Sequence, residues 1–282
     1  MTSSYRDSYQ DGGSGAQGGA TMPRMTPMVK LLLIANAVTF AAQFLLGFTG
    51  ARGMEIQVAG LAPQVWADFF PFVPFWQVVT YGFLHSTNDP MHLLWNLLLL
   101  YFFGTMLEAI VGSRRFLATY VGALLAGASL HLAAEFLGGS RHPAIGASGA
   151  VLGVLIAVAV LRPNTQVIVL FIPIALKWLA VGIVGIDVFF VLKGFQGMSD
   201  GTAHYVHVGG AAFGFLAARR GWIWKDPIQT LRNRRSKIAA HQVELRGKHL
   251  DDLLAKIHRE GLGSLSQREK DFLKRMSGRD RS

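Results

Sequence analysis

Hydrophobic residues gather in six long runs along the chain, and short polar segments separate the runs. A helix needs about 20 apolar residues to cross a bilayer, and most of the runs approach or exceed that length. The fourth and sixth runs are shorter and rich in glycine. The predicted spans cover residues 28–48, 91–111, 116–138, 146–161, 167–192 and 202–218. This pattern predicts an all-α polytopic membrane protein whose six-helix bundle occupies residues 28–220.

The two polar segments around the first span differ in composition. Residues 1–27 are rich in Gly, Ser and Gln and nearly free of apolar side chains, so we expect a disordered N-terminal tail without a cleavable signal peptide. The connection between the first two spans contains aromatic residues broken by prolines, from Pro63 to Trp76. Because aromatic side chains favour the membrane interface, we expect this loop to lie there.

The last segment, residues 221–282, is a basic tail that we expect to be cytoplasmic. Apolar residues recur at helical spacing between positions 249 and 260, and Ser266 with Glu269 forms a capping-box pattern that opens a second helix. We therefore expect a small helical hairpin over about 249–277, attached by a basic linker. Its partner would be anionic lipid or another protein, although a solvated tail explains the charge equally well.

Composition supports a membrane protein and restricts its chemistry. Hydrophobic residues make up 51% of the chain and charged residues only 16%, against about 25% in soluble domains, and the mean hydropathy is +0.35. The absence of cysteine excludes disulfides, thiol catalysis, iron–sulfur clusters and cysteine-bound zinc. We expect neither a cofactor nor a nucleic-acid partner.

Basic residues also predict the orientation of the spans. Residues 1–218 carry 10 Lys and Arg against 9 Asp and Glu, a net charge of +1, whereas residues 219–282 carry 17 against 8, a net charge of +9. Loops rich in Lys and Arg stay on the cytoplasmic side. We therefore expect a multi-pass protein of a bacterial cytoplasmic membrane, with both termini in the cytoplasm.

Reactive side chains occur at a similar depth in the three even-numbered spans. Asn96 lies about five residues into the second span, with His92 one turn before it, while Ser148 opens the fourth span and His207 lies about five residues into the sixth. At 1.5 Å per residue, all of them lie within about 10 Å of the same membrane face. Such groups are costly inside a membrane and mark functional sites. A hydroxyl, a base and an amide donor at one depth predict nucleophilic acyl-transfer chemistry.

Small residues beside these groups predict close packing of two helices. Gly149 and Gly153 lie four residues apart in the fourth span, as do Gly210 and Gly214 in the sixth, and Gly146 precedes the serine. Such spacing lets helix backbones approach closely. A close approach is required because a Ser–His hydrogen bond needs about 2.6–3.2 Å between its heavy atoms.

Three segments together resemble the rhomboid intramembrane serine proteases: HSTNDPMHLLWNLLLLYFFGTMLE, GASGAVLG and AHYVHVGGAAFGF. The resemblance covers about residues 28–220 and implies a rhomboid-like six-helix bundle. It implies that Ser148 is the nucleophile and His207 the base of a dyad, and that His92, Asn96 and the Ser148 backbone N–H bind the oxyanion. The implied activity is endoproteolysis of transmembrane-helix substrates near the extracytoplasmic membrane face. The motif glycines of the family match Gly146, Gly149, Gly210 and Gly214.

Other polar residues in the spans leave alternatives open. His204 lies three residues before His207 and is the second candidate for the base. Asp187 in the fifth span fits an interhelical hydrogen bond better than a proton relay, because no acidic partner lies near it in sequence. His131 and Glu135 are one turn apart, but the HExxH motif of zinc proteases is absent, so we expect no metal.

Three other functions compete with the protease. A catalytically silent rhomboid-like protein that binds transmembrane helices would lack the nucleophile or the base. A transporter would show internal repeats, which this chain lacks. A haem-binding cytochrome would need space near His207 that the surrounding small residues deny. The joint presence of Ser148, His207 and Asn96 favours the protease.

Overall fold

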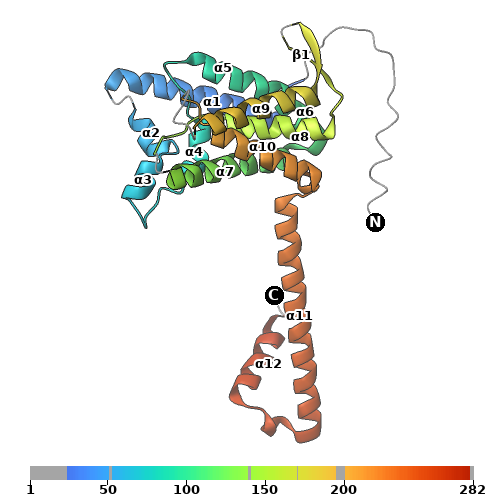
Figure 1. The fold of residues 1–282 in the computed structure, drawn as a ribbon. Coiled ribbons are helices and arrows are strands. Elements are labelled where there is room, and N and C mark those ends of the chain that lie inside the picture. Colours follow the sequence, from blue (N-terminus) through green and yellow to red (C-terminus); the bar gives the residue numbers. More distant parts are fainter. Residues whose placement is uncertain (1–23, 51–52, 139–140, 170, 195–200, 280–282) are drawn as a thin grey trace. The chain divides into compact units, whose positions relative to one another are not determined.

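A computed structural model gives the fold, and it describes residues 24–50, 53–138, 141–169, 171–194 and 201–279 (Figure 1). The N-terminal tail predicted over residues 1–27 lies almost entirely outside the described residues. The chain divides into two compact units, Met1–Ile223 and Trp224–Ser282, each described by itself below.

Each of the six apolar runs contains a helix, and these helices make up most of the first unit. The second run contains a short π-helical segment, η3, between two α-helices. The bounds are α1 (Pro27–Leu46), η1 (Gly47–Thr49), α5 (Pro90–Leu99), η3 (Leu100–Gly104), α6 (Thr105–Val111), α7 (Ser113–Gly138), α8 (Ser148–Leu161), α9 (Leu176–Gly194) and α10 (His204–Arg219).

Three helical stretches among the described residues are long and apolar enough to cross a membrane. They are Pro27–Thr49, Pro90–Val111 and Ser113–Gly138, whereas α8 is apolar but only 14 residues long. The chain is therefore a helical membrane protein. The presence of six membrane spans remains a prediction.

Helix α8 forms the core of this unit. Every residue from Gly149 to Ala159 is buried. The helix is apolar on all faces, as is typical of a helix covered by other helices or by lipid. Helices α7 and α10 pack along it and along each other, and α9 packs on α10 (Figure 1).

The aromatic loop after the first helix is folded around Gln77. This side chain accepts hydrogen bonds from the Ala62 backbone and the Trp66 indole and donates to the Gln57 carbonyl. The short helices of the loop are α2 (Met54–Ala59), α3 (Pro63–Asp68), α4 (Gln77–Thr80) and η2 (Tyr81–Phe83). Phe70 and Phe72 stay 79% and 85% exposed, an arrangement that fits a loop in contact with lipid.

The fifth predicted span begins later than expected. We expected a helix from residue 167, but Gln166–Val169 (β1) and Ile172–Ala175 (β2) pair as an antiparallel hairpin, and α9 starts at Leu176. The two strands are rich in Val and Ile, whose β-branched side chains favour strands over helices. Hydropathy alone did not separate the hairpin from the helix that follows it.

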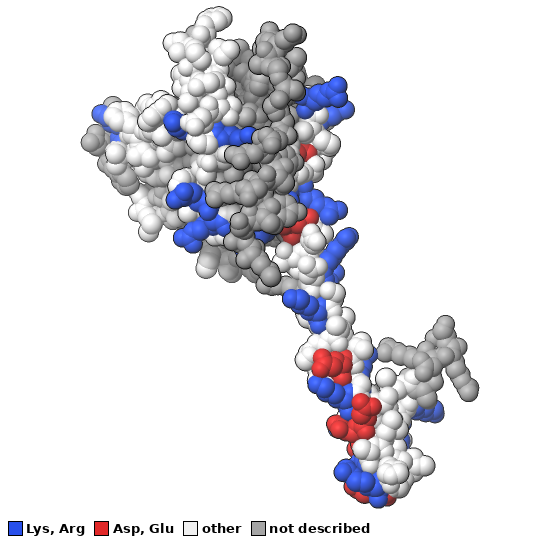
Figure 2. Space-filling model, turned by 90° about the vertical axis from the view of Figure 1, so that its right-hand side faces the viewer, with Lys and Arg blue, Asp and Glu red and all other residues white. Residues whose placement is uncertain are grey.

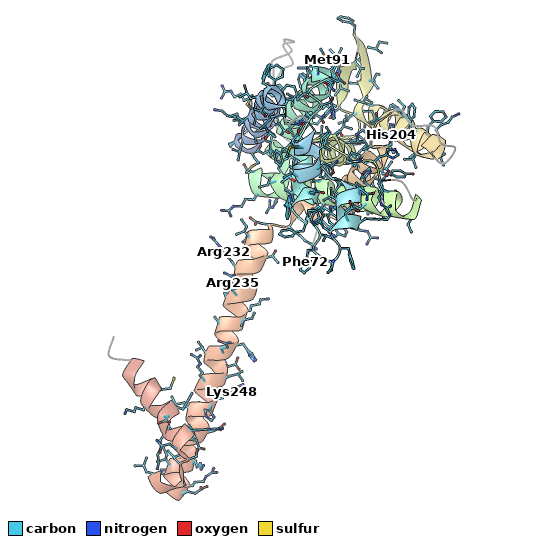
Figure 3. The ribbon with its side chains drawn as sticks, turned by 90° about the vertical axis from the view of Figure 1, so that its left-hand side faces the viewer. Phe72, Met91, His204, Arg232, Arg235 and Lys248 are labelled. Atoms are coloured by element: carbon cyan, nitrogen blue, oxygen red, sulfur yellow. The ribbon has the colours of Figure 1, made fainter. Side chains whose placement is uncertain are left out.

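The second unit is an antiparallel helix pair, and its first helix is longer than predicted. The expected basic linker is itself helical, because α11 runs continuously over Pro227–Glu260 before η5 (Leu262–Ser264) and α12 (Gln267–Arg279). Asp226 caps the start of α11 by accepting from the Ile228 and Gln229 backbones. Figure 2 shows basic and acidic side chains interspersed along this unit, and Figure 3 shows Arg232, Arg235 and Lys248 along α11.

The predicted capping box of the hairpin is confirmed. The Ser266 backbone donates to the Glu269 carboxylate at 2.6 Å, and the Glu269 backbone donates to the Ser266 hydroxyl at 3.4 Å. Lys256 of α11 donates to the same carboxylate at 3.1 Å. Leu253 of α11 and Leu265, which lies just before α12, are both buried.

Candidate functional site

Two helix ends bring Ser148 and His207 together. Ser148 is the first residue of α8, and His207 is the fourth residue of α10. The His207 Nε2 lies 2.7 Å from the Ser148 Oγ, within hydrogen-bond distance. Because the first N–H groups of a helix have no acceptor within that helix, the Ser148 backbone N–H is available to a ligand.

Glycine pairs set the separation of these two helices. A Cβ built on Gly210 would lie 2.0 Å from the Gly149 carbonyl oxygen, and a Cβ on Gly214 would lie 2.0 Å from that of Gly153. The backbones of α8 and α10 therefore touch along two turns, as the small-residue spacing predicts.

The His92 ring occupies the space that the missing side chain of Gly146 leaves, on the side where Ser148 lies. A Cβ on Gly146 would lie 2.7 Å from the His92 Nε2 and 3.7 Å from the Ser148 Oγ, and this glycine has a φ of +120°. Only glycine adopts such a backbone without strain. Gly146 thus allows the His92 ring tip to lie near Ser148.

Asn96 lies one turn deeper than His92 on α5 and is buried. Its side-chain amide donates to the His92 carbonyl at 2.7 Å. A primary amide carries two hydrogens, so one hydrogen is used within α5 and the second can serve another acceptor.

His85, in the loop before α5, supports the His92 ring. The two imidazoles pack edge to face with centroids 5.1 Å apart. Gln43 of α1 holds the His85 backbone, since its amide oxygen accepts from the N–H and its amide nitrogen donates to the carbonyl. Burial lowers the pKa of His85 to about 4, and the nearby His92 adds to this effect, so the ring is neutral at pH 7.

His131 and Glu135 of α7 anchor the segment that leads into Ser148. The His131 Nε2 lies 2.9 Å from the His142 carbonyl, and Glu135 accepts from the His142 backbone at 2.8 Å. Ala144 then bridges to Leu61, and the Gly146 backbone donates to the Tyr81 carbonyl. His131 and Glu135, considered above as metal ligands, thus bind protein backbone.

Asp187 of α9 faces both histidines of α10. Its Oδ1 lies 2.8 Å from the His207 Nδ1 and 2.7 Å from the His204 Nδ1, and the carboxylate is almost completely buried. The expected interhelical hydrogen bond exists, but its partners include the candidate base itself. His207 lies between Asp187 and Ser148, whereas His204 contacts the carboxylate and stacks on Phe190.

Comparison with known sequences identifies the first unit. The profile of the rhomboid domain matches residues 74–222, just over half of the chain. The chain belongs to the rhomboid family. The matched range contains all the candidate site residues, from His92 to Gly214.

Two curated relatives illustrate the similarity of this rhomboid domain. The presenilin-associated rhomboid-like protein, mitochondrial, of Rattus norvegicus is 28% identical over 144 residues, which cover 48% of this chain and 36% of the relative. RHOMBOID-like protein 12, mitochondrial, of Arabidopsis thaliana is 32% identical over 158 residues, which cover 51% and 45%. The chain thus spans less than half of either relative. Both names are mitochondrial, so these relatives give no support to the bacterial membrane expected above.

The hairpin of the second unit matches a different family. Residues 242–279 correspond to DUF6576, a family of unknown function. The segment outside the rhomboid domain therefore recurs in other proteins.

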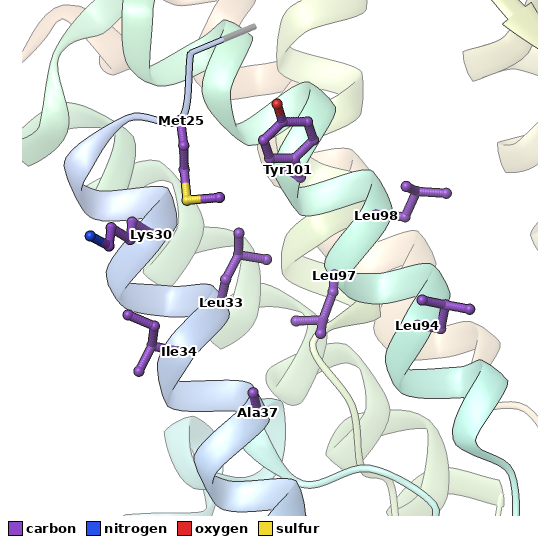
Figure 4. A pocket seen from close by; sticks show the side chains of 9 residues that line it. All are labelled: Met25, Lys30, Leu33, Ile34, Ala37, Leu94, Leu97, Leu98 and Tyr101. Atoms are coloured by element: carbon purple, nitrogen blue, oxygen red, sulfur yellow. The ribbon is translucent and has the colours of Figure 1, made fainter. Parts of the chain in front are cut away.

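An apolar hollow of about 550 Å³ lies between α1 and α5 (Figure 4). Leu33 and Ile34 of α1 and Leu97 and Leu98 of α5 line it. None of its lining residues belongs to the candidate site, so the Ser148 region is separate from this hollow.

Proposed function

We propose that this rhomboid protein is an intramembrane serine endopeptidase that cleaves transmembrane-helix substrates near the extracytoplasmic face. The single observation that carries the proposal is the 2.7 Å contact between the His207 Nε2 and the Ser148 Oγ. A serine hydroxyl is a weak nucleophile unless a base lies within this distance. The contact joins the two reactive residues that the motifs of the family also select.

The reaction begins with transfer of the Ser148 proton to His207. As the proton leaves, the Oγ forms a bond to the carbonyl carbon of the scissile peptide, and the carbonyl oxygen becomes an oxyanion. His207 then gives the proton to the leaving amine, and the C–N bond breaks. A water molecule repeats the sequence on the acyl-enzyme and frees the new carboxylate.

Three donors surround the place where the oxyanion forms. The Ser148 N–H points from the positive end of α8, the His92 ring tip lies beside Gly146, and Asn96 carries a further amide hydrogen. Fixed donors of this kind lower the barrier by about 3–4 kcal/mol each in serine proteases.

The membrane setting follows from the same proposal. With six spans and both termini cytoplasmic, Ser148 and His207 lie within about 5 Å of the extracytoplasmic ends of α8 and α10, because the helices rise 1.5 Å per residue. That depth gives water access to the acyl-enzyme. A reporter protein fused after Arg220 should lie on the cytoplasmic side of the membrane. A reporter found on the extracytoplasmic side would contradict this orientation.

The activity is tested with the full chain in liposomes and a single-span test substrate. We expect the native chain and the His204→Ala variant to cut, and the Ser148→Ala and His207→Ala variants to be inactive. Cleavage by Ser148→Ala would show that another group is the nucleophile.

A fluorophosphonate probe separates the protease from the catalytically silent alternative. Labelling of the native chain at Ser148 without cleavage would indicate an active site that needs another substrate. An unlabelled, inactive native chain would instead support a protein that only binds transmembrane helices.

A further inference from the structure

We propose that Asp187 is a positioning residue that holds His207 in the tautomer needed for catalysis, and that His204 braces Asp187 in this role. The inference rests on the proposed protease activity and deepens it. It changes the expected dyad into a chain of three residues, Asp187, His207 and Ser148, with a second imidazole on the same carboxylate.

The carboxylate, the imidazole and the hydroxyl lie in the order that a proton-accepting histidine requires. The His207 ring has one nitrogen 2.8 Å from the Asp187 Oδ1 and the other 2.7 Å from the Ser148 Oγ. Asp187 comes from α9, His207 from α10 and Ser148 from α8, so three helices converge on one ring. The contact crosses 20 residues of sequence and is not a local capping interaction.

The chemistry of a carboxylate determines which ring nitrogen carries the hydrogen. An ionised carboxylate only accepts hydrogen bonds, so the His207 Nδ1 that faces it is protonated. In the neutral ring the Nε2 is then an unprotonated acceptor that faces the Ser148 hydroxyl. When His207 takes the serine proton, the buried carboxylate stabilises the imidazolium that forms.

His204 explains how the carboxylate keeps its orientation. Its Nδ1 lies 2.7 Å from the same Oδ1, one turn before His207 on α10. The His204 ring stacks on Phe190 of α9, with centroids 4.8 Å apart and planes 4° from parallel. Two donors on one oxygen, one of them fixed by stacking, leave the Asp187 side chain little rotational freedom.

Asp187, His204 and His207 form a cluster of possible metal ligands, but their spacing suits a metal poorly. Zinc holds nitrogen and oxygen ligands at about 2.0–2.2 Å, so the ligand atoms of a tetrahedral site lie more than 3 Å apart. The nitrogen-to-oxygen distances here are 2.7 and 2.8 Å, which are hydrogen-bond lengths. The cluster is therefore assigned to proton positioning.

The first experiment measures kcat and KM of the full chain in liposomes for Asp187→Asn, with Asp68→Asn on α3 as the matched control. The amide of Asn presents a donor to His207 and favours the wrong tautomer. In a serine protease that change lowers kcat by about 10⁴-fold. We expect kcat to fall by about 10²- to 10⁴-fold with KM nearly unchanged, while Asp68→Asn behaves as native.

His204→Phe tests the brace separately, because Phe retains the ring that stacks on Phe190 but cannot donate. One charge-assisted hydrogen bond is lost, so we expect kcat to fall by about tenfold. A native rate in folded Asp187→Asn would overturn the positioning role, and a native rate in His204→Phe would overturn the brace.

A second readout does not depend on activity or on the folding of a variant. The ¹⁵N chemical shifts of the native chain, labelled at histidine, report which nitrogen of His207 carries the hydrogen. We expect the Nδ1-protonated form, and an Nε2-protonated ring would refute the inference. If fluorophosphonate does not label the native chain, the protease proposal fails. The ¹⁵N chemical shifts of His207 would still show whether Asp187 sets its tautomer.

Discussion

Replacing Gly210 with alanine is the sharpest test of how helix packing controls the site. The new Cβ would meet the Gly149 carbonyl oxygen at 2.0 Å, and that oxygen belongs to the backbone and has no rotamer to change. An ordinary contact begins at 3.4 Å, so α8 and α10 must separate by about 1.4 Å. Overpacking of this kind destabilises a fold by about 1–3 kcal/mol.

The same displacement acts directly on the contact between Ser148 and His207. Ser148 is adjacent to Gly149, and His207 is one turn before Gly210, so the separation carries over to the Ser–His distance. The 2.7 Å contact would lengthen to about 4.1 Å, beyond hydrogen-bond range. A misplacement of about 1 Å costs about 10²-fold in rate. We expect Gly210→Ala to lose at least this factor in cleavage and in fluorophosphonate labelling.

The assay compares Gly210→Ala with Gly182→Ala in liposomes. Gly182 lies in α9, and a Cβ there meets no atom within 4 Å, so this control adds the same methyl group without a clash. Thermal unfolding in detergent verifies that both variants are folded. A folded Gly210→Ala that cleaves at the native rate would refute the argument that glycine contacts set the Ser–His distance.

Three further predictions concern other parts of the chain. Asn96→Ala should lower kcat by about 10²- to 10³-fold in the cleavage assay with KM unchanged, if its amide stabilises the oxyanion. Glu108 accepts from the first backbone N–H groups of α1, so Glu108→Ala should lower stability by about 1–2 kcal/mol in thermal unfolding. Hydrogen bonds from Ser266 and the charge of Lys256 lower the pKa of Glu269 from 4.5 to about 2. The hairpin should therefore be fully stabilised above pH 4.5 and lose this contribution as the pH falls towards 2, as hydrogen exchange in α12 would show.

Hydropathy predicted the positions of the helices because burial in lipid or protein requires apolar residues wherever a helix lies. It did not predict where the fifth helix begins, since a β-hairpin of Val and Ile is as apolar as a span. The long α11 was missed for the opposite reason. Its first half carries four Lys and Arg between Arg232 and Lys237, and that cluster of charge suggested a linker instead of a helix.

Asp187 shows a limit of reading residues in isolation. Its sequence neighbours are apolar, and no acidic residue lies near it in sequence, so the sequence around it does not connect it with the candidate base. The partner is an imidazole on the next helix. Two histidines three residues apart on α10 share one face, and a carboxylate on the preceding helix is the group that such a pair can bind. That combination was present in the sequence and indicates the contact.

The choice between His204 and His207 can be argued from the register of the glycines. Gly149 contacts Gly210, and Gly153 contacts Gly214, so the two helices are level at these pairs. Ser148 lies one residue, or about 1.5 Å, before the first pair, so its partner on α10 must lie close enough to that level for the two side chains to meet. Position 207 meets that condition, whereas position 204 lies about 4.5 Å further along the helix axis. His204 can therefore reach Asp187 but is displaced by a turn from the serine, and the same packing that brings α8 and α10 together favours His207 as the base of the proposed protease.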